Sequence, residues 1–372
     1  MKVLWLTNIP SPYRVDFFTE LGNYCDVTVL FERRNALDRE NKWLADKFSN
    51  FKAIFLKSTV IGNEVGLSFE VLKFVKKNQY DIIIVSNYYS PTGMLMIKAL
   101  KARKLPFGLV ADGGIPKKDK GIMRWIKTHF IKSASFWLSS GILTDQYLIS
   151  YGAKEEKIFH FPFTSLRKQE VDEAFLSCKG DKQFYKGQLG IKEPKAVLSI
   201  GQFIHRKGFD VLLKSAASLP DNFGVYIIGG EPTQEYINLI NKFNIKNVHF
   251  VGFQTKIQLK EYYKACDLFV LPTREDIWGL VINEAMAFGL PVITTNRCVA
   301  GLELIKDYEN GFIVPIEDIE TLMLNIQDIL DNDDIRQIMS NNNLSTIKTY
   351  TIENMAKIHF EIFKEILVKG EC

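Results

Sequence analysis

The chain has 372 residues, more than one hydrophobic core usually fills, so we expect two domains with a cleft between them. Hydrophobic residues make up 47% of the chain and charged residues 24%, a composition typical of folded proteins and unlike that of disordered ones. The formal net charge is only +4, without the clustered basicity of proteins that neutralise nucleic-acid phosphates. We therefore expect no nucleic-acid partner.

The cysteines and the N-terminus indicate the compartment. The cysteines are scattered without CxxC spacing, which favours neither a zinc site nor a disulfide framework and indicates a reducing cytoplasm. The N-terminal run MKVLWLTNIPSPYR has a short apolar part followed by Pro and Arg, so it predicts a buried first strand and not a signal peptide. No apolar run reaches the roughly 18 residues that a membrane span needs. We expect a soluble or peripheral protein.

Short runs rich in Val, Ile, Leu and Phe alternate with helix-length segments, which is the pattern of buried parallel strands joined by crossover helices. In the first half this pattern predicts strands at about 2–7, 25–31, 53–57, 81–86, 106–111 and 135–143. In the second half it predicts strands at about 196–201, 225–228, 248–251, 268–271, 291–294 and 311–314. The sequence therefore predicts an α/β protein whose architecture occurs twice.

These two series set the expected domain boundaries. Residues 1–165 form the first predicted domain and residues 196–350 the second. Between them, residues 166–195 lack strand periodicity and accumulate Gly, Pro and Lys, which indicates a linker and hinge. Apolar residues at helical spacing predict an amphipathic helix in the C-terminal segment, 351–372, and such a helix can pack back on the first domain.

Two common nucleotide-binding fingerprints do not occur in the sequence. No GxGxxG follows the first predicted strand, and no GxxxxGK[ST] occurs in the chain. A dinucleotide-dependent oxidoreductase and a P-loop ATPase therefore lose their main sequence support.

The segment GQFIHRKG, from Gly201 to Gly208, lies where a predicted strand ends and a predicted helix begins. Ligands of open α/β sheets bind at such strand ends. Arg206 and Lys207 stand beside the helix N-terminus, where an ammonium, a guanidinium fork and the helix dipole together suit a diphosphate. A solvated basic turn has the same local sequence, so this segment alone decides nothing.

Residues 271–293 are more specific, because they predict a strand, an acidic loop, a short helix and the next strand. Asp276 precedes the helix, and Glu284 lies about one and a half turns into it, so both carboxylates can line one site with the amides near Gly279 and Leu280. Carboxylates accept protons from vicinal hydroxyls, and helix amides bind phosphate. The alternative is a surface helix whose acidic side chains serve only to interact favourably with the helix dipole.

Together these segments resemble the retaining glycosyltransferases of family 4, which have the GT-B fold of two Rossmann-like domains facing a central cleft. Residues 201–210 match that family's strand-to-helix turn, and Asp276 with Glu284 matches its motif of two acids separated by seven residues. The resemblance covers 196–320 and extends more weakly to the first domain. It implies transfer of a sugar from a nucleoside-diphosphate sugar, with the second domain holding the donor and the first the acceptor.

The resemblance also implies roles for individual residues. Arg206 and Lys207 would bind the donor diphosphate, Glu284 the ribose and Asp276 the donor sugar. The family usually has Glu at the position of Asp276, and Glu275, one place earlier, competes for that role. The remaining substrate-binding candidates of the second domain are Gly201, Gly279 and Leu280.

Two residues of the first domain are further candidates. Arg14 lies in the predicted loop after the first strand and could face phosphates, although a prolyl loop that only begins a helix fits equally well. Asp112 follows the predicted strand 106–111 and is a candidate catalytic residue. Several relatives have a functional histidine in this region and this sequence has none, so the family's first-domain catalytic residue does not transfer.

Residues 117–132 mix Lys and Arg with large apolar residues, Trp125 among them, at helical spacing. A basic amphipathic helix of this kind can lie on an anionic membrane surface. An ordinary helix with one buried face and one solvated basic face has the same pattern. Both interpretations stay open.

We expect a retaining transferase that moves a sugar to an acceptor hydroxyl on a glycan or lipid-linked acceptor, in capsule or lipopolysaccharide assembly, in the cytoplasm or on the inner face of the membrane. No metal or other cofactor is expected, because no DxD-like pair follows a predicted strand and Asp333 with Asp334 falls in a predicted exposed helix. The alternatives are a GT-B sugar-nucleotide epimerase, a phosphorylase, or a non-catalytic subunit that binds nucleotide sugar beside an active transferase.

Overall fold

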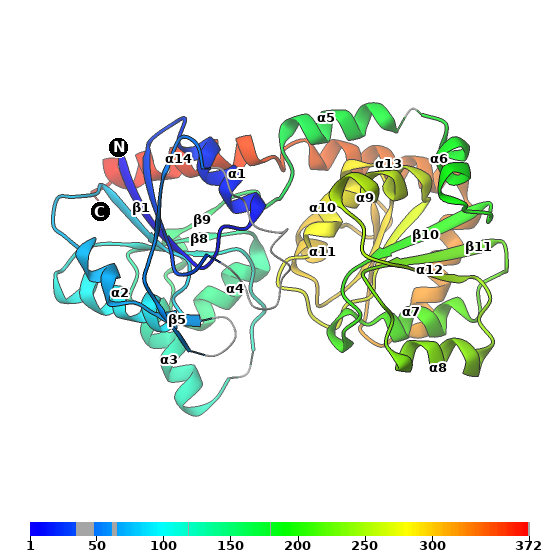
Figure 1. Ribbon diagram of the computed structural model, residues 1–372, viewed down its shortest axis with the longest axis horizontal. Helices are drawn as coiled ribbons and strands as arrows, with labels where there is room; N and C mark the ends of the chain where they lie inside the picture. Colours follow the sequence, from blue (N-terminus) through cyan, green and yellow to red (C-terminus); the bar gives the residue numbers. More distant parts are fainter. Residues whose placement is uncertain (35–47, 62–64, 118, 179, 371–372) are drawn as a thin grey trace. The chain divides into compact units, whose positions relative to one another are not determined.

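The computed structural model describes residues 1–34, 48–61, 65–117, 119–178 and 180–370. The chain divides into two compact units, one formed by Met1–Ser165 with Thr351–Cys372 and the other by Leu166–Tyr350. Each unit contains a parallel sheet with helices on both faces (Figure 1). The prediction of an α/β fold with two Rossmann-like sheets is confirmed.

The sheet of the first unit has the strand order β3-β2-β1-β6-β7-β8-β9, and all neighbouring strands run parallel. Its strands are β1 (Lys2–Thr7), β2 (Asp26–Phe31), β3 (Lys52–Phe55), β6 (Ile82–Val85), β7 (Gly108–Ala111), β8 (Phe136–Ser139) and β9 (Ile158–His160). A separate antiparallel pair is formed by β4 (Thr59–Ile61) and β5 (Val65–Leu67). The strand order reverses between β1 and β6, which is where ligands of such sheets bind.

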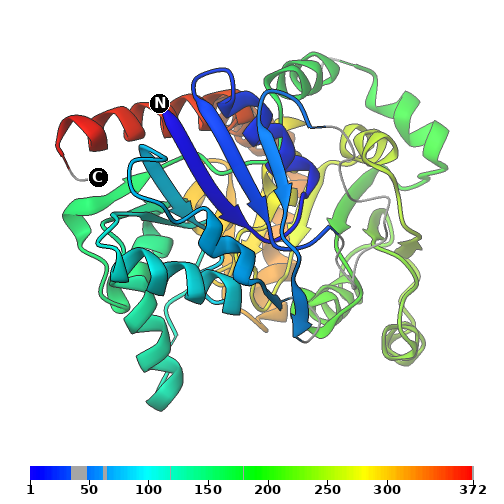
Figure 2. The same ribbon diagram turned by 60° about the vertical axis from the view of Figure 1, so that its left-hand side comes forward.

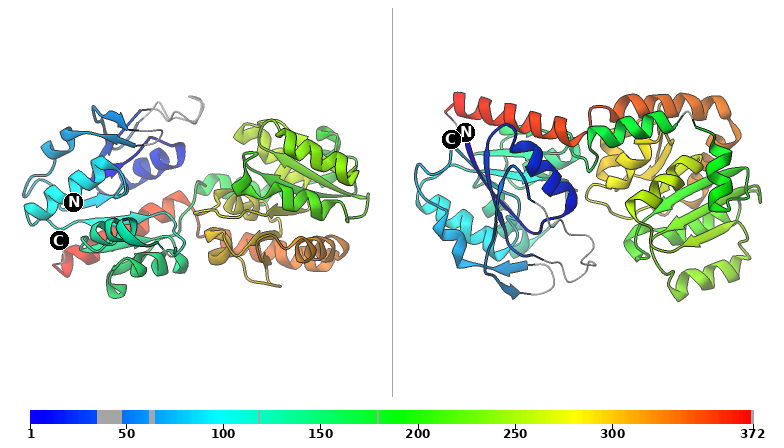
Figure 3. Two further views of the ribbon diagram at one scale, coloured as in Figure 1. Left: turned by 90° about the horizontal axis from the view of Figure 1, so that it is seen from below. Right: turned by 45° about the horizontal axis from the view of Figure 1, so that its top comes forward.

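Helices from the two ends of the chain lie side by side on one face of this sheet. They are α1 (Pro12–Leu21) and α14 (Ile352–Val368), the predicted C-terminal amphipathic helix (Figures 2 and 3). Trp5 on β1 anchors both, because its ring makes edge contacts with Phe17 and Phe18 of α1 and with Phe363 of α14. The core on the other side of β1 includes residues of η2 (Phe69–Lys73), α2 (Pro91–Ala102), α3 (Gly121–Ile131) and α4 (Ile142–Ser150).

The second unit has the strand order β12-β11-β10-β13-β14-β15, again parallel throughout. Its strands are β10 (Lys195–Ile200), β11 (Phe223–Ile228), β12 (Val248–Val251), β13 (Leu268–Leu271), β14 (Val292–Thr295) and β15 (Gly311–Val314). One face packs on α7 (Phe209–Ala216), α8 (Gln234–Phe243) and α12 (Ile319–Asp331). The remaining helices include α9 (Lys256–Ala265), α10 (Leu280–Ala287), α11 (Val299–Leu304) and α13 (Asp333–Ile347), of which α10 and α13 contact each other.

Two predictions about local structure were wrong. The strand predicted at 135–143 ends at Ser139, and α4 begins at Ile142. The polar Ser140 and Gly141 separate two apolar runs that periodicity had merged. Residues 166–195, which we expected to be a linker, contain α5 (Lys168–Ser177) and α6 (Lys182–Leu189) within the second unit. Of the C-terminal segment, residues 371–372 lie outside the described part of the chain.

Candidate functional site

The loop after β10 packs closely against the loop after β13. Gly208 has φ +69°, and a Cβ there would lie 2.0 Å from the carbonyl oxygen of Pro272, so only glycine permits this approach. Arg274 supports the same contact: its amide donates to the carbonyl of Arg206 at 2.8 Å, and its guanidinium makes two 2.8 Å bonds to the Asp210 carboxylate. Burial would raise the pKa of Asp210, but the bonds and charge of Arg274 lower it. Asp210 ends the turn 201–210 that the sequence matched to the family, whereas Arg274 was not among the predicted site residues.

This arrangement brings together three residues that the sequence analysis predicted. Lys207 Nζ lies 2.7 Å from Asp276 Oδ2, and each side chain is 13% exposed. Arg206 Nη1 lies 3.8 Å from the other oxygen of Asp276 and donates to the carbonyl of Glu275 at 2.8 Å. The two cations, both on η4 (His205–Lys207), therefore lie near one carboxylate at the strand ends. Gly201, also predicted, sits at the foot of this loop, where an added Cβ would meet Lys207 Cε at 3.2 Å.

The neighbouring acids Asp276 and Glu275 have different partners. Glu275 Oε2 lies 3.3 Å from Arg297 Nη2, on the loop after β14. The amide of Asp276 donates to the carbonyl of Arg297 at 2.9 Å, which holds the backbone between them. Asp276 thus reaches Lys207, while Glu275 faces Arg297.

Helix α10 begins as predicted, with Gly279 as its N-cap and Leu280 as its first residue. Gly279 has φ +101°, and a Cβ there would lie 2.8 Å from Cys298 Sγ, so glycine is required at this turn. The first amides of a helix have no partner within it, and those at the start of α10 follow Asp276 in the chain. The sequence interpretation of this helix start is confirmed, while the role of its amides in binding stays a prediction.

Glu284 on α10 is oriented by Tyr263 of α9, a residue that the sequence analysis missed. The Tyr263 hydroxyl donates to Glu284 Oε2 at 2.9 Å, and the Tyr263 ring stacks on Phe288 with 5.3 Å between centroids. Burial and the Glu284 carboxylate raise the pKa of Tyr263 far above its usual value, so the hydroxyl keeps its proton. Nothing in the spacing of Tyr263, 21 positions before Glu284, signals this contact.

A pocket adjoins Glu284. Its lining includes the apolar side chains of Leu259, Ala287 and Phe288 and the cations Lys256 and Lys260. Each lysine also has an acidic partner on α5: Lys256 lies 2.6 Å from Glu170, and Lys260 lies 3.4 Å from Glu173. The pocket thus presents a carboxylate, a buried phenol and cations around an apolar floor.

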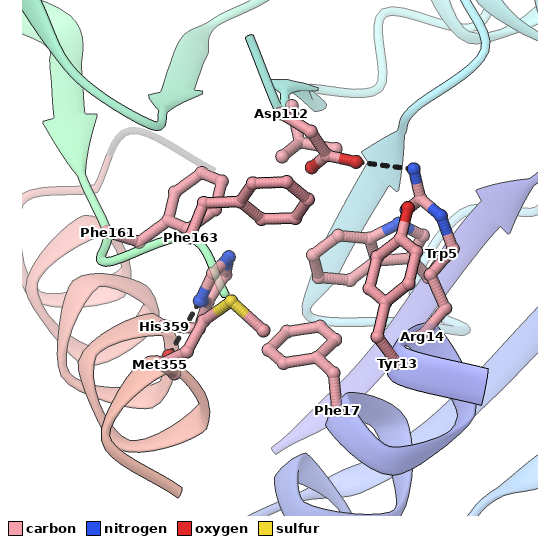
Figure 4. Close-up of a pocket in the computed structure, with 10 residues that line it drawn as sticks. Trp5, Tyr13, Arg14, Phe17, Asp112, Phe161, Phe163, Met355 and His359 are labelled. Carbon is pink, nitrogen blue, oxygen red and sulfur yellow. Dashed lines mark hydrogen bonds and ion pairs between the residues drawn. The ribbon is translucent and has the colours of Figure 1, made fainter. Parts of the chain in front are cut away.

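The two candidates of the first unit form an ion pair with each other. Arg14 Nη2 lies 2.5 Å from Asp112 Oδ2, across the strand ends of β1 and β7 (Figure 4). Burial would lower the pKa of the Arg14 guanidinium, but its interactions with Asp112, Tyr13 and Tyr89 together outweigh burial, and the pKa is raised. The structure therefore joins these two residues, which the sequence analysis had proposed separately.

Helix α3 carries the basic segment predicted at 117–132, of which Lys118 lies outside the described residues. Three large apolar side chains on it are exposed: Ile122 at 75%, Met123 at 53% and Trp125 at 63%. Its last turn is buried at Phe130 and Ile131. In the described part of the chain, no helix is long and apolar enough to cross a membrane.

Comparisons with known proteins show similarity to glycosyltransferases. Residues 181–345 match the family described as Glycosyl transferases group 1. An uncharacterized glycosyltransferase of Haemophilus influenzae is 32% identical over 176 residues, which are 46% of this chain and 49% of that protein. The chain thus spans about half the length of the first curated relatives it matches.

Two further similarities extend over most of the chain. A Campylobacter jejuni protein named N,N'-diacetylbacillosaminyl-diphospho-undecaprenol alpha-1,3-N-acetylgalactosaminyltransferase is 22% identical over 309 residues, covering 80% of this chain and 81% of that protein. The crystal structure of Anabaena HepE in complex with UDP and glucose has a TM-score of 0.73 at 16% identity and covers 99% of each chain. At this identity, the structural likeness concerns the fold.

Proposed function

We propose that this chain, whose residues 181–345 match the glycosyl transferases of group 1 and whose fold is that of GT-B glycosyltransferase structures, transfers a sugar from a nucleoside-diphosphate sugar to an acceptor hydroxyl. The observation that carries the proposal is the meeting of Arg206 and Lys207 with the carboxylate of Asp276 at the strand ends of the second unit. The named ligands of HepE, UDP and glucose, support the same class of donor. A charged donor suits a site in which cations are already assembled.

In this proposal, donor binding replaces one anionic partner of Arg206 and Lys207, the Asp276 carboxylate, by another, the diphosphate. The diphosphate binds Arg206 and Lys207 in competition with the Asp276 carboxylate, and amides at the start of α10 add donors. Asp276, released from Lys207, then accepts hydroxyl protons of the donor sugar. The cations stabilise the charge that develops on the leaving diphosphate, which lowers the barrier to transfer. We propose retention at the anomeric carbon: the acceptor oxygen bonds to that carbon on the face from which the diphosphate leaves, the bond to the diphosphate breaks, and the leaving diphosphate takes the acceptor's hydroxyl proton.

Glu284 and Tyr263 provide the nucleoside contact. A carboxylate accepts two hydroxyl protons at once, so Glu284 suits the vicinal hydroxyls of a ribose. Tyr263 donates to one Glu284 oxygen and thereby sets the direction of the carboxylate. The apolar floor beside Glu284 offers a surface for the rest of the nucleoside.

We also propose a place for the reaction. The Campylobacter relative is named for an undecaprenol-linked substrate, which supports a lipid-linked glycan as the acceptor in capsule or lipopolysaccharide assembly. The exposed Ile122, Met123 and Trp125, with Arg124 between them, support contact of α3 with an anionic membrane surface. This would place the chain on the cytoplasmic face of a membrane.

The donor proposal is tested by thermal shift and turnover. Wild-type protein is screened with UDP, GDP and ADP and their sugars, because a ligand that binds only the folded state raises its melting temperature. We expect one nucleotide to raise it and its sugar to be consumed with release of free nucleoside diphosphate. Binding without any release, in the presence of lipid-linked acceptors, would instead make the chain a non-catalytic binding subunit.

The membrane proposal is tested by sedimentation with vesicles of phosphatidylglycerol or phosphatidylcholine. We expect binding to phosphatidylglycerol that weakens about tenfold or more in Trp125→Ala, because one buried aromatic side chain contributes about 1.5–3 kcal/mol. Ile338→Ala, which removes a side chain of 57% exposure on α13, is the matched control. Equal loss in both variants, or no binding by the wild type, would rule out α3 as the contact.

A further inference from the structure

The turn that carries the two cations of the donor site has little packing of its own. It is η4 (His205–Lys207), a single 3₁₀ turn in which no residue is buried. Within it, the Lys207 amide donates to the carbonyl of Ile204 at 2.9 Å, and the Gly208 amide donates to that of His205 at 3.2 Å. Bonds of 3₁₀ turns have poorer geometry than those of α-helices. The position of Lys207 therefore depends on what holds the backbone of this turn from outside.

Arg274, on the loop after β13, holds this backbone with both its main chain and its side chain. Its amide donates to the carbonyl of Arg206 at 2.8 Å, and its Nη1 donates to the carbonyl of His205 at 2.6 Å. The Thr273 hydroxyl also donates to the Arg206 carbonyl, at 2.9 Å. These carbonyls directly precede Arg206 and Lys207 in the chain, so the bonds fix the two peptide units from which the cationic side chains start.

The Arg274 guanidinium has no donor left for a substrate. A guanidinium has five N–H donors, and all five are used by protein groups. Two go to the Asp210 carboxylate at 2.8 Å each, one to the carbonyl of His205, and two, from Nε and Nη2, to the Glu317 carboxylate. The side chain is only 15% exposed, whereas that of Arg206 is 45% exposed. Arg274 therefore acts on its neighbours in the protein and does not contact a ligand itself.

Glu317 completes this network from a strained backbone position. It lies between β15 and α12 and has φ +63°, a left-handed conformation that is unfavourable for a residue with a Cβ. Its bonds to Arg274 join the loop after β15 to the loops after β10 and β13 at the strand ends of the second unit. Strained residues of this kind cluster at functional sites, where the surrounding structure holds them. The strain at Glu317 thus indicates that this network serves a site.

We propose that Arg274 is a positioning residue for the donor diphosphate. By fixing the η4 backbone, it keeps Arg206 and Lys207 in place when the diphosphate displaces the Asp276 carboxylate, so that only side chains move. Small displacements of groups that hold a reacting centre lower the rate strongly. The inference rests on the proposed function, because the diphosphate is the ligand of the two cations there. Arg274 should matter for the diphosphate and not for the nucleoside, which the proposed function places at Glu284.

The test compares two ligands in Arg274→Met, which keeps an apolar stem but removes every donor of the guanidinium. One is the nucleoside diphosphate that raises the melting temperature in the thermal-shift screen, the responsive nucleotide, whose sugar is the responsive donor. The other is its nucleoside without phosphate. We expect affinity for the responsive nucleotide, measured by calorimetric titration, to fall about tenfold, because the two cations lose their fixed arrangement. Affinity for the nucleoside, measured by saturation-transfer NMR, should stay that of the wild type.

Arg336→Met is the matched control. The side chain of Arg336 is 14% exposed, and it also bonds two backbone carbonyls, of Ile329 and Leu330, and one carboxylate, of Asp333. This variant removes an equally buried guanidinium of the second unit without a change at η4, so it should bind both ligands as the wild type does. Equal losses of nucleotide affinity in Arg336→Met and Arg274→Met would show a general effect on stability and would overturn the inference.

The outcomes separate this inference from the donor proposal. Absence of nucleotide binding by the wild type would overturn both. If the wild type binds, and a folded Arg274→Met binds the responsive nucleotide equally well or loses both ligands alike, only this inference is overturned.

A second variant serves if Arg274→Met shows no melting transition. Arg274→Lys keeps the charge, but an ammonium with three donors cannot bond two carboxylates and a carbonyl in the geometry of the guanidinium fork. Its affinity for the responsive nucleotide should fall about threefold or more, with nucleoside affinity unchanged. Wild-type affinity of Arg274→Lys for the responsive nucleotide would then overturn the inference.

Discussion

Each of the two units has its own parallel sheet, but the charged side chains at the strand ends are paired differently in the two units. In the second unit, acids are matched by cations: Asp276 by Lys207, Asp210 by Arg274. In the first unit, Arg14 and Asp112 form one such pair, while His359 and Glu32 are buried without an opposite charge in hydrogen-bond contact. Glu32, after β2, is 1% exposed and receives bonds only from uncharged groups in the described chain, Ser90 and Asn87.

The comparison indicates that the strand ends of such a sheet provide the position of a site, while the side chains there determine which ligand it binds. Assembled cations at the second unit suit an anionic ligand, because the cost of bringing them together is met by the fold before the ligand arrives. At the strand ends of the first unit, the cation Arg14 is already paired with Asp112, and the buried His359 imidazole is neutral. Each prediction below changes side chains in one of the two units.

The largest effect is expected when a cation of the second unit is removed. Lys207→Ala should slow release of nucleoside diphosphate from the responsive donor by about 100-fold or more, because charge on the leaving group loses a preorganised partner. Turnover under saturating donor is the measurement. Lys242→Ala, a lysine of α8 in the same unit, is the matched control. Equal turnover in wild type and Lys207→Ala would contradict the assignment.

In the first unit, Glu32 should make stability depend on pH. Burial raises the pKa of Glu32 to about 7, above the value of 4.5 for a solvated Glu. The folded state therefore holds a proton that the unfolded state has lost between these values, and stability falls as pH rises from about 4.5 to 7. Glu32→Gln removes this loss, so its unfolding free energy at pH 8, relative to wild type, should exceed that at pH 5 by about 2 kcal/mol.

Urea unfolding at both pH values measures this difference, provided that each transition is two-state. His359 acts in the opposite direction, since burial lowers its pKa to about 4 and stability is lost as pH falls from about 6.5 to 4. His359→Phe should remove that acid-side loss. If the unfolding free energy of wild type and Glu32→Gln depended on pH in the same way, the pKa of Glu32 would not differ between the folded and unfolded states.

A smaller effect is expected at Tyr263. Tyr263→Phe keeps the stacked ring but removes the hydroxyl that orients Glu284, and donor KM should rise about fivefold with kcat little changed. Tyr262→Phe, one position earlier on α9, is the control, because Tyr262 makes no bond to Glu284 in the described structure. A fall in kcat with unchanged KM would refute a positioning role in donor binding.

The smallest effect separates the two adjacent acids. Glu275 lies beside Arg297, with side chains 29% and 35% exposed, and such a pair contributes about 1 kcal/mol at most. Glu275→Gln should therefore change donor affinity by less than about twofold, whereas Asp276→Asn should change it clearly. Fluorescence competition with the responsive nucleotide measures both. Equal effects of the two substitutions on donor affinity would indicate that Glu275 also contacts the donor.

The sequence predicted most strands of both sheets, because buried parallel strands are short apolar runs bounded by polar residues. It also predicted the residues around Asp276 and Lys207, since both lie in strand-to-helix loops. It missed α5 and α6, whose buried residues are few: Val171, Ala174 and Lys186. Tyr263 and His359 were missed for another reason, because their partners come from distant helices and loops that no local pattern joins.

The central claim, that the second unit binds a nucleoside-diphosphate donor through Arg206, Lys207 and Glu284, is tested most directly by calorimetric titration. Wild type and Glu284→Gln are titrated with UDP, GDP and ADP at one ionic strength. The account predicts that one nucleotide binds wild type at one molecule per chain and binds Glu284→Gln several-fold more weakly. Absence of binding by all three, or equal affinity of both proteins, would contradict it.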